Sequence, residues 1–445
     1  MSKSTYVIKE YGFFIKESQN VDAKMLQQEG NVVLPNDVFE YLESFILDNK
    51  NDFDIEHHDL MQIYHKKGIG KIIKAKNYVG TIQTPKGVTI EVLPKIYISS
   101  NENSYEKTKK IFLEMLKSMK DMPFKTFNMA NLDTVNMELL DVFIVMFLDE
   151  ISVLIKKGLK SFYIKEEGNL NYLRGKLLIN KHISKNIISK DKFYLEYDEY
   201  SKNIPENKII KSTLLKLKNI TSKPSIQNRI QKYSFAFDKV DKSLNHEKDF
   251  SRCTNNRLMS DYKLALEWSK IFLQDKGFSS YRGGSKSYSL LFPMEKVFES
   301  YVANSIKKSN LFNGFEIIIQ ARKDETMYLF ETPKRFKLKP DIIMKSSDKT
   351  IILDTKWKNL YDNSSKNYGI SQSDMYQMYA YSKKYAASKI ILVYPYNDEA
   401  KKILNYNQYE DLTFKSNDGV NIQIYFFDIE NTKNSLYELY NLIEI

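Results

Sequence analysis

The sequence predicts an α+β protein of several domains. We expect a β-rich N-terminal domain over residues 1–100, a mainly helical middle region over 101–280 and a C-terminal α/β domain with a mixed sheet over 281–445. The chain has 445 residues, more than one hydrophobic core usually serves. Its hydrophobic pattern also changes along the chain, from strand-like alternation to helical spacing and then to a mixture of the two.

The N-terminal domain is predicted from short apolar segments separated by turn residues. The pattern indicates a strand pair over Tyr6–Lys16, a helix over Leu34–Leu47 and further strands over Gly70–Ile96. Thr84-Pro85-Lys86-Gly87 is a good turn sequence, because proline presets φ and glycine tolerates the closing conformation. These features predict a β-rich domain with one helix.

The middle region shows apolar residues at helical spacing. The pattern predicts helices over residues 104–120, 135–159, 205–235 and 257–276. The polar stretch 238–256 has no packing signal and is predicted to be a linker. Residues 171–177, which contain Arg174, Gly175 and Lys176, are predicted to form a loop or strand that presents two cations.

The C-terminal domain alternates helices and strands. We predict a helix over 294–307, a strand over 315–321, a hairpin, a helix over 373–385 and strands over 390–394 and 422–427. The order α-β-β-β-α-β is typical of a mixed α/β sandwich. The hairpin lies in the middle of its predicted sheet.

That hairpin carries the chemistry. Residues 341–345 and 350–354 are predicted to be its strands, and residues 346–348 its turn. If the turn centres between residues 347 and 348, Asp341 lies opposite Asp354, with Cβ atoms roughly 4.5–5.5 Å apart. Side chains alternate along a strand, so Lys356 shares the face of Asp354. Two carboxylates and an ammonium group would therefore converge.

This trio suits metal-assisted cleavage of a phosphodiester. Mg²⁺ prefers carboxylate and carbonyl oxygens and keeps several waters. Asp341 and Asp354, with the backbone carbonyl of Thr355, are predicted to hold one or two such ions. Lys356 is predicted to orient or deprotonate the attacking water. Burial and the cations would lower its pKa and the carboxylates would raise it, and the sequence leaves the outcome open.

Two flanking helices offer further groups. Glu295 and Glu299 lie four residues apart at the edge of an apolar stripe, and either is a candidate third carboxylate. We choose Glu299, because it borders the predicted buried face. Gln377 and Tyr381 share one face of the later helix and are predicted to hydrogen-bond the scissile phosphate or the hairpin.

Composition narrows the class of partner. Lys and Arg number 67 against 56 Asp and Glu, a net charge of +11, which favours an anionic partner such as nucleic acid. Proteins of AT-rich genomes are often basic anyway, so this observation adds little by itself.

The single cysteine, Cys253, excludes an internal disulfide framework and fits a reducing cytoplasm. No apolar run approaches the roughly 18 residues of a membrane span, so we expect a cytoplasmic protein without membrane contact.

Several segments of the chain, together with their order along it, resemble the McrC subunits of McrBC-type restriction systems. The C-terminal domain of those subunits is a PD-(D/E)xK nuclease. The catalytic triplet Asp341, Asp354 and Lys356 fits that nuclease pattern. Gln377-Met378-Tyr379-Ala380-Tyr381 is similar to the Q-x-x-x-Y element of RecB-like nucleases. The other similar segments are residues 78–80 with 90–96, 170–176, 196–200 with 205–211, and 292–299.

The resemblance implies a Mg²⁺-dependent DNA endonuclease that cuts double-stranded DNA within a restriction complex. It also implies a separately encoded McrB-like AAA+ GTPase ring, which the nuclease subunit binds and stimulates. The chain itself has no G-x-x-x-x-G-K-[ST] sequence, so it carries no P-loop of that kind. By this resemblance the N-terminal domain contacts the ring, and Arg174 with Lys176 is a second candidate for ring or phosphate contact. The equal alternative is that these are ordinary basic surface residues, and the methylation state of the target stays open.

Three other functions compete with this interpretation. The chain is a regulatory adaptor of an AAA+ ring if its nuclease site is inactive. It is a stand-alone nuclease for RNA or repair intermediates if it cuts without a partner. Two carboxylates could also serve glycoside hydrolysis, but that chemistry leaves Lys356 and the basic surplus unexplained.

Overall fold

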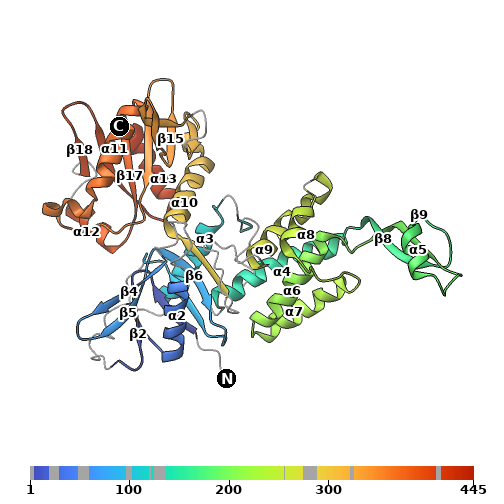
Figure 1. The fold of residues 1–445 in the computed structure, drawn as a ribbon. Helices are drawn as coiled ribbons and strands as arrows, with labels where there is room; N and C mark the ends of the chain where they lie inside the picture. Colours follow the sequence, from blue (N-terminus) through green and yellow to red (C-terminus); the bar gives the residue numbers. More distant parts are fainter. Residues whose placement is uncertain are drawn as a thin grey trace. The chain divides into compact units, whose positions relative to one another are not determined.

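The computed structural model describes residues 5–19, 30–48, 60–96, 103–119, 122–124, 137–254, 256–273, 288–320, 325–406 and 412–444. Its contacts divide the chain into two compact units. The first combines Met1–Leu139 with Tyr281–Ile445, and the second is Leu140–Ser280. Both units mix helices and strands, so the protein is of the α+β class (Figure 1).

The N-terminal part of the first unit forms two four-stranded sheets, of order β3-β2-β5-β4 and β1-β7-β6-β11. The strand β11 lies within the predicted C-terminal domain, but it pairs antiparallel with β6 of the N-terminal part. The predicted boundary at residue 281 lies outside the described residues. The strands are β1 (Thr5–Lys9), β2 (Phe13–Lys16), β3 (Asn31–Leu34), β4 (Met61–Lys66), β5 (Gly70–Ala75), β6 (Tyr78–Gln83), β7 (Thr89–Leu93) and β11 (Tyr288–Pro293).

The two strands predicted over Tyr6–Lys16 both exist, but their pairing with each other is wrong. The strand β1 pairs with β7, whereas β2 pairs with β3 and β5. The chain passes from one sheet to the other at Tyr11, whose φ is 66°, and Gly12. A Cβ on Gly12 would lie 2.1 Å from the carbonyl oxygen of Gly30, so only glycine fits this tight passage.

The turn at Thr84 and the first two helices are confirmed. The Thr84 amide donates to the Val88 carbonyl at 2.8 Å, and this turn joins β6 to β7. The predicted helices form as α2 (Asn36–Asp48) and α3 (Asn103–Leu116). The apolar face of α2 packs on the core of the N-terminal sheets, which buries Phe39 and Leu42.

The second unit is built around α4 (Leu139–Lys157), whose Phe143 and Phe147 pack against Trp268 and Phe272. Within the described part of the chain, no helix combines the length and apolar character needed to cross a membrane. The other helices of this unit are α5 (Ile179–Lys185), α6 (Pro205–Ile220), α7 (Pro224–Ser234), α8 (His246–Arg252) and α9 (Lys263–Leu273).

Two predictions in this unit are wrong. The single helix predicted over 205–235 is two helices, because Pro224 lacks the amide that would continue α6 and instead begins α7. The stretch 238–256 is no featureless linker, because it contains α8. The side chain of Asn245 caps this helix by accepting from the Lys248 amide, and Ser243 is tied to α6 by its amide.

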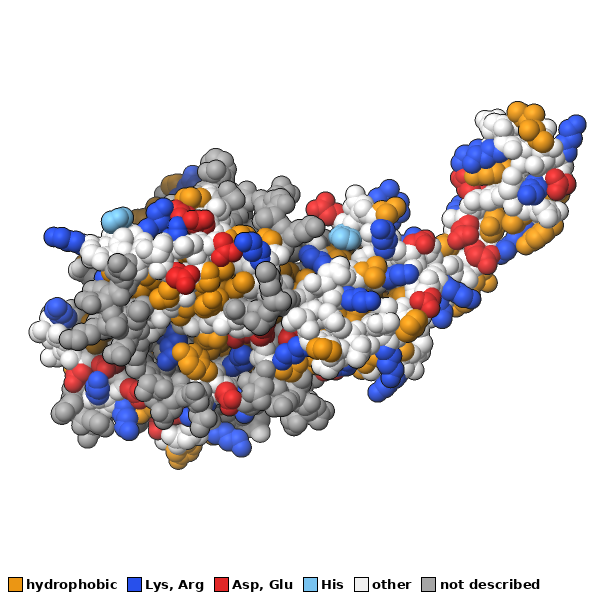
Figure 2. Space-filling model, turned by 90° about the horizontal axis from the view of Figure 1, so that it is seen from below, with side chains coloured by type: hydrophobic (Ala, Val, Ile, Leu, Met, Phe, Trp, Pro, Cys, Tyr) orange, Lys and Arg blue, Asp and Glu red, His pale blue; other side chains and the backbone are white. Residues whose placement is uncertain are grey.

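The second unit also contains an antiparallel sheet of order β8-β10-β9, which the helical prediction missed. Its strands are β8 (Phe162–Leu170), β9 (Lys176–Leu177) and β10 (Phe193–Ser201). Half-buried and exposed residues alternate along β8, but the half-buried positions include Glu166 and Gly168, so the apolar alternation that marks a strand is weak. Figure 2 shows hydrophobic side chains among charged ones on the surface of this part, at the right-hand end.

The C-terminal part of the first unit forms a six-stranded sheet of order β12-β15-β16-β17-β19-β18. The strands β15 and β16 are antiparallel, whereas β16, β17 and β19 are parallel, so the sheet is mixed as predicted. The strands are β12 (Glu316–Ile319), β15 (Ile342–Lys345), β16 (Thr350–Thr355), β17 (Lys389–Pro395), β18 (Thr413–Lys415) and β19 (Asn421–Phe427).

The predicted order α-β-β-β-α-β is confirmed in α10 (Met294–Lys308), β12, β15, β16, α11 (Gln372–Tyr385) and β17. Five elements after α10 were not predicted, and one of them is the edge strand β18. The strands β13 (Met327–Glu331) and β14 (Lys334–Leu338) form a separate hairpin, and α12 (Asp398–Tyr406) and α13 (Thr432–Glu444) flank β18 and β19 along the chain. The division into three domains stays a prediction.

Candidate active site

Asp341 and Asp354 lie opposite each other at one end of the hairpin β15–β16. The ladder pairs Ile342 with Leu353, and the same register continued by one residue pairs the two aspartates. The predicted turn and register are therefore confirmed. The apolar run 351–353 is buried, and it fixes the register because a slip by one residue would expose it.

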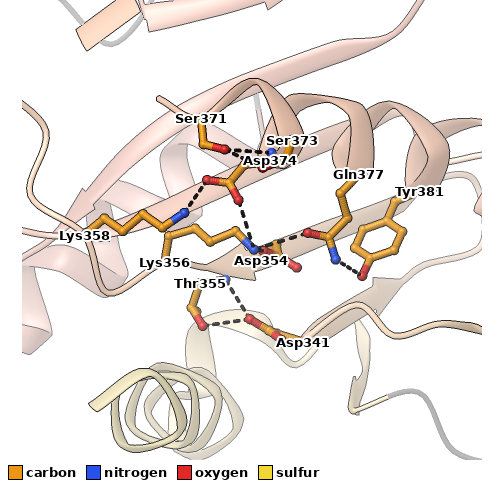
Figure 3. Close-up of polar contacts among 10 residues, drawn as sticks. All are labelled: Asp341, Asp354, Thr355, Lys356, Lys358, Ser371, Ser373, Asp374, Gln377 and Tyr381. Carbon is orange, nitrogen blue, oxygen red and sulfur yellow. Dashed lines mark hydrogen bonds and ion pairs between the residues drawn. The ribbon is translucent and has the colours of Figure 1, made fainter. Parts of the chain in front are cut away.

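Thr355 holds the side chain of Asp341. Its backbone amide and its hydroxyl both donate to Asp341 Oδ2, each at 2.7 Å (Figure 3). Two donors on one oxygen fix the orientation of the carboxylate. The role predicted for the Thr355 carbonyl as a metal ligand stays a prediction, and the observed contacts add a positioning role for its amide and hydroxyl.

Asp354 is almost completely buried and lies beside Lys356. The exposed fraction of Asp354 is 1%, and its Oδ2 atom lies 2.5 Å from Lys356 Nζ as an ion pair. Among the described residues, none donates to this oxygen with hydrogen-bond geometry. The charge of this buried oxygen is therefore balanced by the Lys356 ammonium through the ion pair.

Burial and neighbouring carboxylates raise the pKa of both aspartates. Burial raises the pKa of Asp341 to about 6, and the nearby charge of Glu299 adds to this rise. Burial and the charge of Asp341 raise the pKa of Asp354 to about 7. Burial alone would lower the pKa of Lys356, but the ion pair with Asp354 and the other carboxylates raise it. Among the groups of this chain the carboxylates therefore outweigh burial and favour an ammonium ion.

The helix α11 brings Gln377 and Tyr381 to the hairpin. Lys356 Nζ lies 3.4 Å from Gln377 Oε1, and Gln377 Nε2 donates to the Tyr381 hydroxyl at 2.7 Å. Figure 3 shows Gln377 pointing from this helix toward Lys356. The expected contact between this helix face and the hairpin is present.

Asp374 is a site residue that sequence reasoning missed. It is buried, its Oδ2 accepts from Lys358 at 2.8 Å, and its Oδ1 lies 4.0 Å from Lys356 Nζ. Asp374 precedes Gln377 by three residues, so helical spacing would have placed both on one face. Ser371 begins this helix as the cap that accepts from the Asp374 amide.

The structure separates the two glutamates of α10. Glu299 Oε1 accepts from Gln320 at 2.9 Å, and burial together with the charge of Asp354 raises the pKa of Glu299. The negative charge of Glu295 instead acts at Glu10 and Lys95, where it favours a higher pKa of each group. Glu299 is therefore the glutamate that lies among the charges of the hairpin.

Trp357, directly after Lys356, is held by the N-terminal sheets. Its indole N–H donates to Glu10 Oε2 at 2.9 Å, and its carbonyl accepts from Lys95 Nζ at 3.3 Å. The Lys95 amide donates to the same Glu10 carboxylate at 3.1 Å. Burial raises the pKa of Glu10 to about 7. The contacts of Trp357 with Glu10 and Lys95 thus anchor the segment that carries Lys356.

The donors suit a hard cation such as Mg²⁺, although they form no closed cage. Asp341, Asp354 and Glu299 supply carboxylate oxygens, and the Asp354 oxygen is paired with Lys356 in this structure. Over the described ranges, no three acidic, histidine or cysteine side chains stand close enough to hold an ion by themselves. Mg²⁺ is commonly bound by one or two carboxylates, with waters and substrate phosphates completing its shell. The residues present fit that open mode of binding.

Comparisons with known proteins give one family and two related structures. A family model described as "McrBC 5-methylcytosine restriction system component" matches residues 73–395. A chain from the half-complex of a tetradecameric assembly of Thermococcus gammatolerans McrB AAA+ hexamers with bound McrC is 19% identical, with a TM-score of 0.65, and the match covers 98% of this chain and 100% of that one. A chain from the cryo-EM structure of the Thermococcus gammatolerans McrBC complex is 19% identical, with a TM-score of 0.45, over 68% of this chain and 88% of that one. At 19% identity the first match shows a similar fold and nothing further. The second match is too weak in structure to support a conclusion. No curated protein matches.

Proposed function

Because the chain belongs to the family of McrBC 5-methylcytosine restriction system components, we propose that it is the Mg²⁺-dependent endonuclease subunit of a McrBC-like restriction complex. The substrate is double-stranded DNA, and the reaction is hydrolysis of a phosphodiester bond. The observation that supports this most is the pair Asp341 and Asp354, which share a buried end of one hairpin with Lys356.

Each residue of the site has a role that follows from its contacts. Asp341, oriented by Thr355, and the buried Asp354 hold the cation, with Glu299 beside them. Bound Mg²⁺ would supply charge neutralisation at the phosphate and a more acidic water.

Lys356 enters the reaction as a cation, because its carboxylate neighbours raise its pKa. In that form it orients the attacking water and offsets the negative charge that develops on the phosphate. Gln377 accepts from Lys356, and Tyr381 holds Gln377 in place. Asp374 stabilises the ammonium from the other side.

We also propose that the chain works on an AAA+ GTPase ring. The similar solved structure is described as McrB AAA+ hexamers with bound McrC. The sequence has no P-loop motif of its own, so nucleotide energy would come from such a partner. The N-terminal sheets are the first candidate for the ring contact, and the segment of Arg174 and Lys176 is the second.

The test compares Lys356→Ala with Lys358→Ala in the complete complex. Lys358 is the matched control, because it pairs with Asp374 but is the more exposed of the two lysines. With the ring, GTP and Mg²⁺ present, we expect Lys356→Ala to abolish DNA cleavage while GTPase stimulation persists, and Lys358→Ala to keep both.

Two other results would overturn the proposal. If Lys356→Ala leaves restriction unchanged, the chain acts as an adaptor of the ring. If the purified chain cuts without the ring or GTP, it is a stand-alone nuclease.

A further inference from the structure

We propose that the hairpin β13–β14 is a DNA-binding element, which contacts phosphates with its cations and a groove of the duplex with two phenylalanines. This inference rests on the proposed function, because it assigns the surface that holds the DNA beside the cutting site. The hairpin pairs Met327 with Leu338 at its base and Glu331 with Lys334 at its tip.

The strand β14 and the residue that follows it carry four cations that have no counter-charge among the described residues. Lys334, Arg335, Lys337 and Lys339 are all exposed. Among the residues that the structure describes, no carboxylate forms an ion pair with any of these four side chains. Glu331, the acidic residue of the hairpin strands, lies 3.8 Å from Lys384 of α11 instead. Four unneutralised cations within six residues are suited to phosphates, which release counterions when they are bound.

Two aromatic rings stand exposed among these cations. Phe336 is 71% exposed and Phe330 is 56% exposed. Their ring centroids lie 5.8 Å apart at an interplanar angle of 68°, so the rings form one edge-to-face pair. Apolar side chains of this kind are used to wedge against bases in a groove.

The backbone of Phe336 is strained, and the fold gains no buried contact from the strain. Its φ is +56°, which costs a non-glycine residue on the order of 1 kcal/mol. The regular ladder omits residue 336, pairing Arg335 with Phe330 and Lys337 with Tyr328. The left-handed conformation turns the Phe336 ring onto Phe330 at the surface. Strain retained at an exposed aromatic pair points to a ligand that covers it.

The hairpin is fixed close to the candidate active site. At its base the Tyr385 hydroxyl donates to the Glu325 carbonyl at 3.1 Å and accepts from the Met327 amide at 3.4 Å. Tyr385 belongs to α11, which also carries Gln377. At the same base β14 runs on to Asp341, five residues after Phe336, a span of at most ~17 Å. That span corresponds to about five base steps of one strand.

Duplex DNA fits this surface better than a protein partner does. A protein that covered the phenylalanines would also have to bring acidic groups to four separate cations. The phosphate backbone supplies such charges at regular spacing on both sides of a groove. The partner must also reach Asp341, and the DNA substrate is the molecule that does so by the proposed function.

The test uses two variants of the full chain. One is Lys334→Ala/Lys337→Ala, and the other is Phe330→Ala/Phe336→Ala. The matched control is Lys433→Ala/Tyr437→Ala, which removes an exposed lysine and an exposed ring from α13. Equilibrium binding of a fluorescent 30-base-pair duplex is measured without Mg²⁺ at two salt concentrations, so that cleavage does not interfere.

We expect the lysine variant to bind about tenfold more weakly and to lower the slope of log K against log salt by ~1–2. The phenylalanine variant should bind several-fold more weakly at an unchanged slope, and the control should match the wild type. Unchanged DNA affinity in both variants would overturn the inference. Variants that no longer bind the AAA+ partner but keep their DNA affinity would overturn it as well. A wild-type chain that binds DNA but never cuts it would instead overturn the proposed function.

Discussion

The hairpin β15–β16 and the sheet β8-β10-β9 both carry charged motifs that the sequence singles out, yet their charges stand in opposite environments. In the hairpin, Asp354 is 1% exposed and its pKa is raised to about 7 by burial and by Asp341. In the sheet, Arg174 is exposed and donates to the Glu199 carboxylate at 2.7 Å and to the Asp198 carbonyl at 2.6 Å. Arg174 is thus paired with groups that offset its charge, whereas Asp341 and Asp354 repel each other.

The difference shows which charges store free energy for function. An exposed ion pair contributes little, because water screens it and both side chains lose freedom. Buried carboxylates of like charge are destabilised, so a cation that neutralises them is bound strongly. We therefore expect large effects on cleavage from substitutions in the hairpin and small effects from substitutions in the sheet.

The largest difference should appear with Asp341→Asn and Asp354→Asn. Each removes a negative charge from this pair of carboxylates at nearly constant shape, and DNA cleavage should fall ~10³-fold or more. The control is Asp348→Asn, an exposed carboxylate in the turn of the same hairpin, which should cleave normally. Rates are compared in single-turnover assays with the ring and GTP. Cleavage that survives either substitution in this pair would break the comparison.

Glu10 extends the comparison to pH. Burial raises its pKa from 4.5 to about 7, so between these values the folded chain keeps a proton that the unfolded chain releases. The contribution of Glu10 to stability is therefore present at low pH and is lost as pH rises through this range, by up to ~3 kcal/mol.

The measurement is urea unfolding of wild type and Glu10→Gln at pH 5 and pH 8. The variant, which cannot ionise, should gain stability relative to the wild type as pH rises. Glu199→Gln, at the exposed partner of Arg174, is the control and should show no such trend. A pH-independent difference between wild type and Glu10→Gln would contradict the assigned burial effect.

A smaller effect should follow from Thr355→Val. The valine keeps the backbone amide on Asp341 but removes the hydroxyl donor, so the carboxylate is held by one contact instead of two. Loss of such a supporting contact should lower the cleavage rate on the order of tenfold. Thr355→Ser restores the hydroxyl and should recover most of the rate. If serine and valine behave alike, the hydroxyl does not position Asp341.

The smallest effect on the chain itself should come from Arg174→Ala. The guanidinium contacts Glu199 and Asp198 at the surface, so the melting temperature should stay within about 2 °C of the wild type. Cleavage by an assembled complex should not change in its chemical step. A reduced GTPase stimulation would identify Arg174 as part of the ring contact, whereas a large loss of stability would contradict the comparison.

The sequence predicted what depends on neighbours along the chain. The register of Asp341 and Asp354 follows from a short turn, and the shared face of Gln377 and Tyr381 follows from helical spacing. Both are set within a few residues, so pattern and geometry suffice.

Contacts between distant segments could not be predicted in this way. Trp357 and Glu10 are 347 positions apart, and only the assembled sheets bring them together. Similarly, β11 pairs with β6 of the N-terminal sheet, although the whole second unit separates these strands in the sequence. The strands β8 and β10 were not predicted because their more covered faces include polar residues such as Glu166 and Glu199, which interrupt the apolar alternation. Asp374 was missed although its helical spacing pointed to it.

The central claim is that Asp341 and Asp354 jointly bind a divalent ion beside Lys356. The most direct test is an anomalous difference map from crystals of the chain soaked in Mn²⁺, which replaces Mg²⁺ and is visible by its scattering. We predict a peak within ~2.2 Å of a carboxylate oxygen from each aspartate. A peak on other carboxylates alone, or no peak between these two, would contradict the claim.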